Sequence, residues 1–495
     1  MTSESPAKSS CTRWIKIGII ALAMIGVAAL LIYKYYPSPT TLPARGGELA
    51  KMMGIQNKAP QKLESFKEVK GVLAIQHWVT PQGVSVYFVP VRTLPMVDIQ
   101  LVFDAGAARN GNKGGLAYLT NTLLAEGTLK MSADQVAENF DKLGAQFSAE
   151  SQRDMASLHL RSLSEPSQLI PAVQTLAELV SQPAFLEQGF KREQQNSLSA
   201  LKQQSQSPSQ VASKAFYTAL YPNQPYANWV LGDEKSMAAL NVEDVKAFFK
   251  QYYVAKNMAV TIVGDLSAIE ADAIAQTLAK DMAQGEKPAA LQEVGNLTEN
   301  VVRKVNFPSA QTHILLGEPG VKHGDPDYYA LYLGNHILGG NGSVTRIFDI
   351  IRNKNGLAYS AYSYFVPMRE RGPFILGCQT RNDQADKALS LMQGLLHEFV
   401  EKGPTDEELA AAKKNLLGGY ALRFDSNSAI SQQISALAFY GLPLDYFDKF
   451  KPAIQSIDAD KVKEAFQRRI LTKNMVVVMV GGEAPAAPKA ETPKV

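Results

Sequence analysis

Cysteine is scarce in this chain of 495 residues. Only Cys11 and Cys378 are present, one ahead of the single long apolar run and the other deep in the chain. Two cysteines placed this way exclude a disulfide-stapled scaffold and a cysteine-rich zinc module. The cellular compartment cannot be inferred from so few thiols.

A strong excess of one charge is also lacking. The sequence has 50 lysine and arginine residues against 47 acidic residues, which gives a formal net charge of +3. So small an excess over so long a chain argues against nucleic acid as the main ligand. With 46% hydrophobic and 20% charged residues, the composition also excludes disordered, collagen-like and low-complexity proteins.

Long apolar runs are absent except near the N-terminus. Residues 17–33 carry no charge, and aromatic residues flank the run at Trp14 and Tyr35. The run is at the short end for a membrane span and longer than most signal-peptide cores. Basic residues precede it and no small-residue cleavage site follows it. The pattern therefore favours an uncleaved signal anchor at 17–34 over a cleaved signal, with residues 1–16 in the cytoplasm.

An internal repeat organises the remaining chain. Residues 245–264 and 462–481 align without a gap and share nine of twenty residues, including a Lys-Asn-Met turn and a final glycine. Each copy is typical of a helix, a turn and an apolar strand, so the repeat predicts two homologous domains. The predicted division is a linker and stalk at 35–70, an N-terminal domain at 71–283, a connector at 284–299, a C-terminal domain at 300–483 and a disordered tail at 484–495.

Strands and helices come in blocks within each half. Residues 84–89 form an apolar run, and residues 97–103 alternate as in a half-buried strand. Ser132 is typical of a helix N-cap, and Gly144 ends the helix that follows. This order predicts an α+β fold in which each domain is a mainly antiparallel sheet layered with helices.

Residues 114–128 (GGLAYLTNTLLAEGT) form the most informative predicted helix. Its leucines make a core stripe, and Gly127 is a natural stop. Tyr118, Asn121 and Thr122 stand at positions i, i+3 and i+4, so they share one face of the helix.

This segment resembles the active-site helix of the pitrilysin/insulinase-type zinc metallopeptidases, which include mitochondrial processing peptidase. In active members the helix carries His-x-x-Glu-His within a Gly-Leu-Ala-His…Gly-Thr frame, and the histidines bind zinc while the glutamate activates water. The frame is present here. However, Tyr118 and Thr122 stand at the histidine positions and Asn121 stands at the glutamate position. The resemblance implies a clamshell of two domains with a degenerate zinc site.

The third zinc ligand of the family is a glutamate on a later helix, and the family spacing places it near Ser199 or Ala200. Residues 193–204 contain no acid after Glu193. All four functional positions are therefore lost together, and we expect neither zinc binding nor autonomous zinc proteolysis. The six histidines form no comparable pair and are expected to be surface or core residues: His77, His159, His313, His323, His336 and His397. A metal site built from distant residues remains an alternative.

The second half keeps another block of the same family. Residues 338–343 (LGGNGS) and 351–360 (IRNKNGLAYS) resemble the family's LGG…R-x-K-x-GLAYS pattern. The resemblance implies that Arg352 and Tyr359 reach toward the zinc site of a facing half and stabilise the oxyanion there. Taken alone, they could be a surface arginine and a core tyrosine. The glycine loop, with Gly339, Gly340 and Gly342, could equally be a helix end and turn.

Three functions remain open. The favoured one is a catalytically inactive subunit of a heteromeric peptidase, which contributes peptide binding and the arginine–tyrosine pair to a partner whose HxxEH motif holds the zinc. The second is a non-enzymatic peptide-binding or scaffold protein, since strand edges can add a peptide strand. A hydrolase of another mechanism is disfavoured, because no GxSxG motif is present. The single predicted span indicates the bacterial inner membrane, with the main body in the periplasm.

Overall fold

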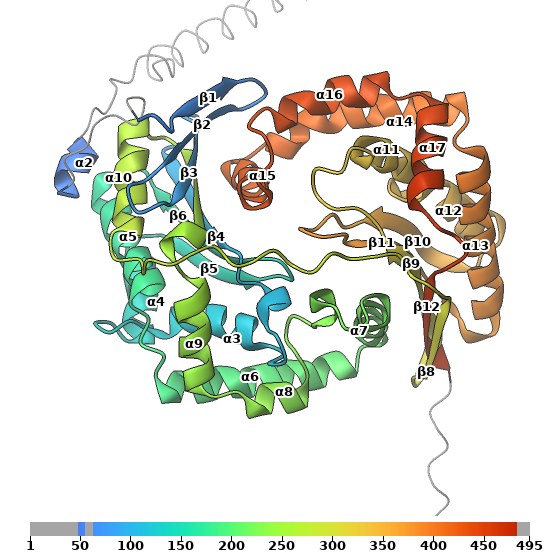
Figure 1. Ribbon diagram of the computed structural model, residues 1–495, viewed down its shortest axis with the longest axis horizontal. Coiled ribbons are helices and arrows are strands. Elements are labelled where there is room, and N and C mark those ends of the chain that lie inside the picture. Colours follow the sequence, from blue (N-terminus) through green and yellow to red (C-terminus); the bar gives the residue numbers. More distant parts are fainter. Residues whose placement is uncertain (1–47, 55–62, 483–495) are drawn as a thin grey trace, which may run out of the picture.

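The computed structural model describes residues 48–54 and 63–482, which form two halves that face each other (Figure 1). Each half is a sheet layered with helices, as the α+β prediction requires. The predicted anchor at 17–34 and tail at 484–495 lie outside the described residues. Within the described ranges, no helix is long and apolar enough to cross a membrane.

The two sheets share one topology. The first has the strand order β1-β2-β3-β7-β4-β6-β5, and the second has the order β8-β12-β9-β11-β10. In each sheet one pair is parallel, β3 with β7 and β8 with β12, and the other pairs are antiparallel. The second sheet therefore repeats the last five strands of the first. The strands are β1 (Lys67–Lys70), β2 (Ala74–Val79), β3 (Ser85–Pro90), β4 (Met96–Phe103), β5 (Gln146–Ser151), β6 (Ala156–Leu163), β7 (Met258–Gly264), β8 (Val301–Asn306), β9 (Ser309–Pro319), β10 (Ala358–Phe365), β11 (Pro373–Arg381) and β12 (Val476–Gly482).

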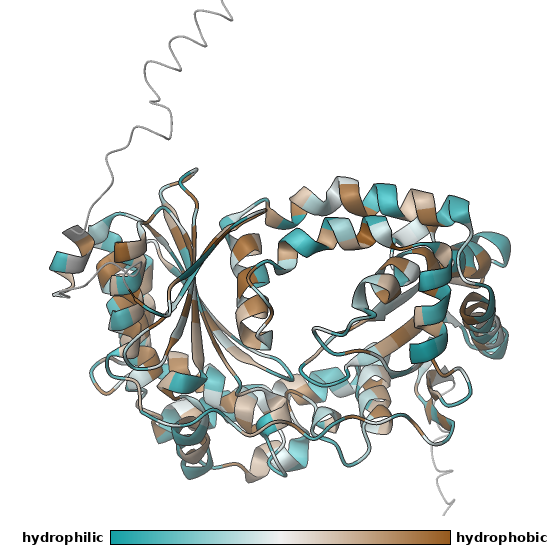
Figure 2. Ribbon diagram, turned by 45° about the horizontal axis from the view of Figure 1, so that its top comes forward, coloured by the Kyte–Doolittle hydropathy of each residue, from teal (hydrophilic) through white to brown (hydrophobic). Residues whose placement is uncertain are grey.

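Helices cover the sheets and turn their apolar faces inward, which leaves polar residues on the outside (Figure 2). The N-terminal half has α2 (Glu48–Met52), α3 (Leu116–Thr122), α4 (Ala133–Lys142), α5 (Pro166–Ser181), α6 (Glu187–Ser205), α7 (Pro208–Leu220), α8 (Glu234–Ala239), α9 (Val242–Tyr252) and α10 (Ala268–Ala279). The C-terminal half has α11 (Tyr328–Leu338), α12 (Arg346–Phe348), α13 (Ala385–Lys402), α14 (Asp406–Gly419), α15 (Asn427–Tyr440), α16 (Tyr446–Ser456) and α17 (Ala459–Arg469).

The structure corrects two local predictions. The helix predicted over 114–128 is shorter, because α3 ends at Thr122 and the chain continues as a 3₁₀ turn, η4 (Leu123–Glu126). Part of the predicted linker at 35–70 belongs to the first half, since β1 pairs with β2 and α2 packs on α10. The β1 sequence KEVK has no apolar alternation because it is an exposed edge strand, so its pattern gave no signal.

One helix from each half packs on the sheet of the other half. Helix α7 lies against β9 and β12, and α15 lies against the corresponding strands β4 and β7 of the first sheet. Buried residues of α7, such as Phe216, join the core of the second half, and Ile434 of α15 joins a core with Val263. This exchange fixes the two halves relative to each other through apolar contacts.

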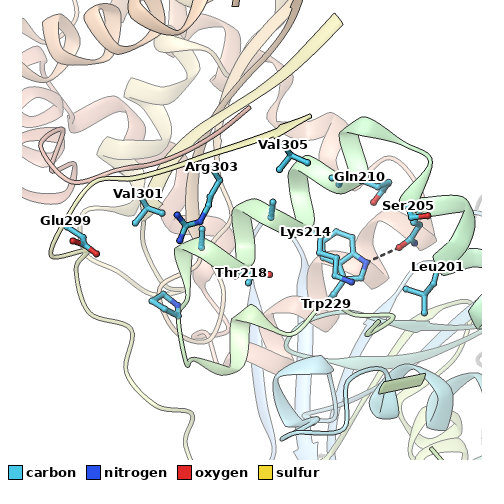
Figure 3. Close-up of a pocket in the computed structure, with 15 residues that line it drawn as sticks. Leu201, Ser205, Gln210, Lys214, Thr218, Trp229, Glu299, Val301, Arg303 and Val305 are labelled. Carbon is cyan, nitrogen blue, oxygen red and sulfur yellow. Dashed lines mark hydrogen bonds between the residues drawn. The ribbon is translucent and has the colours of Figure 1, made fainter. Parts of the chain in front are cut away.

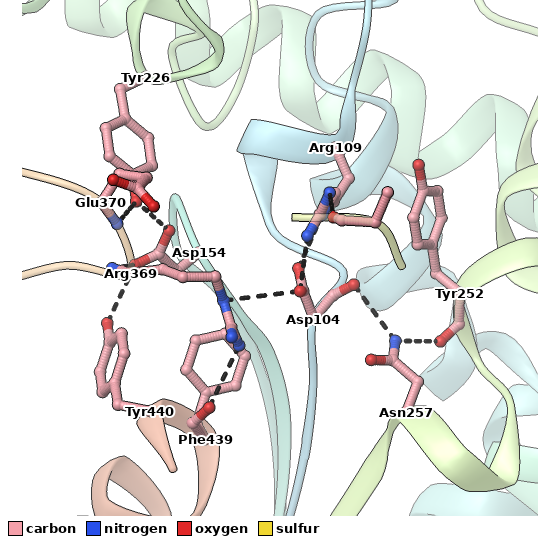
Figure 4. Close-up of polar contacts among 11 residues, drawn as sticks. Asp104, Arg109, Asp154, Tyr226, Tyr252, Asn257, Arg369, Glu370, Phe439 and Tyr440 are labelled. Carbon is pink, nitrogen blue, oxygen red and sulfur yellow. Dashed lines mark hydrogen bonds and ion pairs between the residues drawn. The ribbon is translucent and has the colours of Figure 1, made fainter. Parts of the chain in front are cut away.

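A cluster of polar groups ties the halves together where two hairpins meet (Figure 4). Buried Asp154, in the β5–β6 turn, accepts hydrogen bonds from the hydroxyl of Tyr226 at 2.7 Å and from the backbone N–H of Arg369 at 2.7 Å. It also accepts one from the hydroxyl of Tyr440, at the end of α15, at 3.2 Å. From the N-terminal half, the hydroxyl of Tyr221, which follows α7, donates to the carbonyl of Arg371 in the C-terminal half at 3.1 Å. Each exchanged helix is thus pinned by a tyrosine to the hairpin of the opposite half.

Candidate functional site

The degenerate zinc helix α3 packs between the sheet and two helices of the N-terminal half. It contacts β5, β6, α6 and α9, and Gly115 starts it in a left-handed conformation with φ of 87°. A side chain at Gly115 would meet the carbonyl of Leu231 at 2.8 Å, so glycine is required there. Tyr118 is half-buried against the core, and Asn121 is only 1% exposed.

Asn121 is held by three hydrogen bonds. Its amide nitrogen donates to the carbonyls of Glu150 at 2.9 Å and Ser157 at 3.3 Å, which connects α3 to β5 and β6. Its amide oxygen accepts from the hydroxyl of Tyr253 at 3.0 Å, and burial raises the pKa of that phenol, so it stays neutral. A carboxylate has no donor to offer those two carbonyls. Asn121 therefore stabilises the fold at the position where the family has its catalytic base.

The other degenerate positions offer no ligands either. Thr122 is half-buried at the end of α3, and Ser199 is exposed on α6, where its hydroxyl donates to the carbonyl of Gln195 at 2.9 Å. Neutral tyrosine, asparagine, threonine and serine side chains do not fit a zinc site of the family type. In the part of the chain that the structure describes, no three His, Cys, Asp or Glu side chains gather to hold a metal ion.

Arg352 and Tyr359 lie together in the C-terminal half. Arg352 is in a π-helical turn, η8 (Asp349–Lys354), and Tyr359 is near the start of the edge strand β10. The guanidinium carbon of Arg352 lies 4.3 Å from the ring centre of Tyr359, in cation–π contact. The tyrosine is 81% exposed, although large aromatic residues are usually buried. The pair is thus preorganised within its own half and open to an external group.

The predicted glycine loop forms the end of α11 and the turn after it. Gly339 caps α11, and a side chain there would lie 2.4 Å from the backbone nitrogen of Ser363 in β10. A side chain at Gly340 would lie 2.6 Å from the amide nitrogen of Asn335, and Gly342 has a φ of 56°. The loop holds α11 against the edge strand that carries Tyr359. Among the described residues, no hydrogen bond or ring contact joins Arg352 or Tyr359 to Tyr118, Asn121 or Thr122.

The second half contains a counterpart of Asn121. Aligning residues 117–124 (AYLTNTLL) with 331–338 (LYLGNHIL) places Asn121 opposite Asn335. The amide nitrogen of Asn335 donates to the carbonyl of Ser363 in β10 at 3.1 Å, and its oxygen accepts from the Ser363 hydroxyl at 2.7 Å. Strand β10 occupies in the second sheet the edge position that β5 occupies in the first. Both asparagines therefore fasten a helix to an edge strand.

A polar cavity between the first sheet and α15 was not predicted from the sequence. It has a volume of about 440 Å³ and is lined by residues of β4, β5, β6 and α15, including Glu150, His159 and Ser435. His159 lies 2.7 Å from Asp98, while the buried hydroxyl of Ser435 has no hydrogen-bond partner among the described residues. The sequence of β5 (QFSAES), in which polar residues alternate and no residue is fully buried, could have indicated this cavity.

Comparisons with known proteins agree with the two-domain fold. The family described as insulinase (peptidase family M16) matches residues 91–234, and the family described as peptidase M16 inactive domain matches residues 239–416. A Bacillus subtilis protein named uncharacterized zinc protease YmxG is 25% identical over 360 residues, 72% of this chain and 87% of that protein. A Helicobacter pylori protein named non-peptidase homolog YmxG is 26% identical over 420 residues, 82% of this chain and 94% of that protein.

A solved structure is more similar in sequence. The crystal structure of a peptidase M16 inactive domain from Pseudomonas fluorescens matches with a TM-score of 0.80 and 37% identity, over 84% of this chain and 100% of that chain. The two-domain α+β fold is consistent with these matches. The chain therefore belongs to the insulinase family of peptidases, family M16.

Proposed function

We propose that this protein is a catalytically inactive subunit of a heteromeric zinc peptidase. In this proposal a family member with an intact HxxEH helix supplies the metal site, and this chain supplies peptide-binding surface together with Arg352 and Tyr359. The name non-peptidase homolog, carried by the Helicobacter pylori relative, fits a peptidase-like protein without catalysis of its own.

The arrangement of Arg352 and Tyr359 is the observation that carries the proposal. A guanidinium and a phenol in contact, with the phenol 81% exposed, form two donors suited to a negative charge that develops on a peptide carbonyl oxygen. The degenerate α3 helix of the same chain provides neither a ligand nor a base. The pair therefore needs a metal site from another subunit to act.

A non-enzymatic peptide-binding or scaffold role is the second candidate. The edge strand β5 borders the polar cavity, and an edge strand can take up an extended peptide through its backbone. Asn121 and Asn335 fasten both edge strands to helices without any catalytic use. If no HxxEH partner exists, this role is favoured.

The test begins with affinity purification of the tagged full-length protein from its native membranes. We expect an HxxEH protein in stoichiometric amount, with zinc and zinc-dependent peptide cleavage in the eluate. In that complex Arg352→Ala should lower kcat by about 10²-fold, the typical cost of losing one oxyanion donor, and Tyr359→Phe should lower it as well. Arg381→Ala, an exposed arginine in the same sheet, is the matched control.

Unchanged turnover of the Arg352→Ala complex, with assembly intact by size-exclusion chromatography, would contradict the proposed role of the pair. If the purified sample contains no HxxEH protein and no zinc and cleaves no peptide, the scaffold role is favoured instead.

Anchoring in the bacterial inner membrane, with the main body in the periplasm, is part of the same proposal. It is supported by the uncharged run at 17–33 and the basic residues before it. Deletion of residues 1–34 should release the protein into the soluble fraction of lysed cells. Retention of the truncated protein in the membrane would contradict the anchor.

A further inference from the structure

A groove between α6 and α7 of the N-terminal half and β8 of the C-terminal half shares no residue with the degenerate zinc helix or with the Arg352–Tyr359 pair. It has a volume of about 600 Å³ and lies between α7, the end of α6 and β8 (Figure 3). The buried face of α7 packs on β9 and β12, and Val301 and Val305 on the inner face of β8 are only partly buried beside it. The charged residues of the lining are Lys214, Glu299 and Arg303, and its apolar part includes Trp229 and the aliphatic residues Leu201, Val211, Ala215, Ala219, Val301 and Val305.

Strand β8 is an open edge of the second sheet. Its ladder partner is β12, in parallel, and it ends the strand order of that sheet. The backbone N–H of Val301 donates to the carbonyl of Met475, and that of Phe307 donates to the carbonyl of Gly481. The backbone groups of the odd-numbered residues of β8 therefore point toward β12. In a parallel pair the alternate residues point their N–H and C=O groups away from the partner. The backbone groups of Val302, Lys304 and Asn306 therefore face the open edge.

The side chains of β8 divide between the two faces of the sheet. Val301, Arg303 and Val305 point into the groove, whereas Lys304 lies 3.4 Å from Asp386 at the start of α13. Arg303 has no ion pair or hydrogen bond with any residue that the structure describes, and Lys214 of α7 reaches only the carbonyl of Gly232 at 3.3 Å. Glu299 also lines the groove, but within the described residues it forms no ion pair with Arg303 or Lys214, so both cations remain without a carboxylate at salt-bridge distance.

The charges on β8 indicate which kind of strand can pair with this edge. If a second copy of the chain paired its own β8 here in antiparallel register, the cations at 303 and 304 would meet their equivalents, and opposed like charges destabilise strand pairs. Lysine on an edge strand also acts against self-association. An incoming strand with carboxylates would instead complement Arg303 and Lys214, and its backbone would satisfy the open groups of β8.

We propose that β8 and the adjoining groove bind an extended acidic peptide segment of a partner protein, which adds to the second sheet as a sixth strand. Alternate side chains of this segment enter the groove beside α7 and Trp229, and a carboxylate lies near Arg303 and Lys214. The six residues of β8 span about 20 Å, which suits a segment of about six residues. This site is independent of any zinc-bearing partner.

Fluorescence anisotropy with labelled peptides tests the proposal on the full-length protein. The probe is an acetylated eight-residue peptide with threonine at every second position and valine and glutamate alternating at the other positions, so that valine and glutamate share one face. The same peptide with lysine in place of glutamate is the control. We expect saturable binding of the glutamate peptide alone. Arg303→Glu should weaken it at least tenfold and permit binding of the lysine peptide.

The backbone contribution is tested separately by Val302→Pro. Proline removes the N–H that faces the open edge and leaves the ladder to β12 intact, so the variant should fold but bind at least tenfold more weakly. Val302→Ala is the matched control and should bind as the parent does. Absence of glutamate-peptide binding, or equal binding by the Val302→Pro variant, would overturn strand addition. A dimer in sedimentation velocity that Val302→Pro dissociates would show that a second copy occupies the edge.

Discussion

The two halves share five strands in one order and one exchanged helix each, but they present different groups at equivalent places. The N-terminal half carries the α3 helix, which is closed by the buried Asn121. The C-terminal half carries the same asparagine tie at Asn335, and on the tied strand β10 the open Tyr359 contacts Arg352 of η8. The scaffold therefore stays constant, while the side chains at equivalent places differ between the halves.

A second difference lies within the sheets. In the sequence repeat, Met258 is equivalent to Met475. The residues that follow them also pair with equivalent strands: Ala259 with Val102 of β4, and Val476 with Gly317 of β9. Phe103 of β4 therefore corresponds to Glu318 of β9. Phe103 belongs to the apolar core, whereas Glu318 is a buried carboxyl group with an oxygen that has no hydrogen-bond partner among the described residues. The same position is apolar in one half and ionisable in the other.

The largest expected effect comes from breaking the contact between the halves. Asp154→Ala leaves the hydroxyls of Tyr226 and Tyr440 and the N–H of Arg369 without their acceptor, so the free energy of unfolding should fall by about 3–5 kcal/mol. Denaturant unfolding followed by circular dichroism measures it, and we expect separate transitions for the two halves. Asp154→Asn retains an acceptor and should lose less. A loss below about 1 kcal/mol would show that the exchanged helices alone hold the halves together.

The next effect concerns Glu318 and pH. Burial raises the pKa of Glu318 to about 8, against the opposing effects of the backbone N–H of Leu471 and of the Arg371 charge, which lower it. Between the ordinary glutamate pKa and this value the folded state binds more protons than the unfolded state, so stability falls as pH rises, by about 1.4 kcal/mol per unit. From pH 5 to 7.5 the loss is about 3 kcal/mol.

Glu318→Gln should remove this slope, as measured by urea unfolding at several pH values, while Glu407→Gln on the surface of α14 should leave it. An unchanged slope in the Glu318→Gln variant would show that another group titrates in this range.

A smaller loss of stability is expected when either of the two asparagines is replaced, and the two losses can be compared. Asn121→Ala and Asn335→Ala each leave buried strand carbonyls unpaired, so each should lower the free energy of unfolding by about 2 kcal/mol. Asn196→Ala on the exposed face of α6 is the control. Similar losses would support one structural role for both residues. A variant at Asn121 that is fully stable yet inactive in the complex would contradict that role.

The smallest expected effect is that of Arg352→Ala on stability. Its contacts are cation–π contacts with Phe348 and Tyr359 in an open position, worth about 0.5–1 kcal/mol. Thermal unfolding of the isolated protein should therefore change little. A loss above about 2 kcal/mol would indicate that the pair supports the fold of the C-terminal half and is not held ready for another group.

Much of the fold followed from local patterns. The alternation over residues 97–103 predicted β4, and Ser132 predicted the start of α4, where it forms a capping box with Gln135. The short α3 was not predicted, because the leucine stripe continues through η4 at nearly helical spacing. Strand β1 and helix α2 were missed since an exposed edge strand and a five-residue helix have no clear periodicity.

At the candidate site, residue types could be assigned from the sequence but their contacts could not. The loss of ligands at Tyr118, Asn121 and Thr122 follows from the sequence and the family resemblance. That Asn121 connects α3 to β5 and β6 depends on carbonyls 29 and 36 residues away. The groove at β8 likewise combines residues from α6, α7 and β8, which no local pattern brings together.

The sequence by itself determined the duplicated α+β unit and, through the family resemblance, the replacement of the HxxEH residues by Tyr118, Asn121 and Thr122 and the presence of the Arg352–Tyr359 block, since periodicity and residue identities within a motif are local properties of the chain. The exchange of α7 and α15, the buried Asp154 cluster and the open edge of β8 were decided by the tertiary structure. Each depends on which distant surfaces exclude water from one another, and that is settled only when the two halves pack.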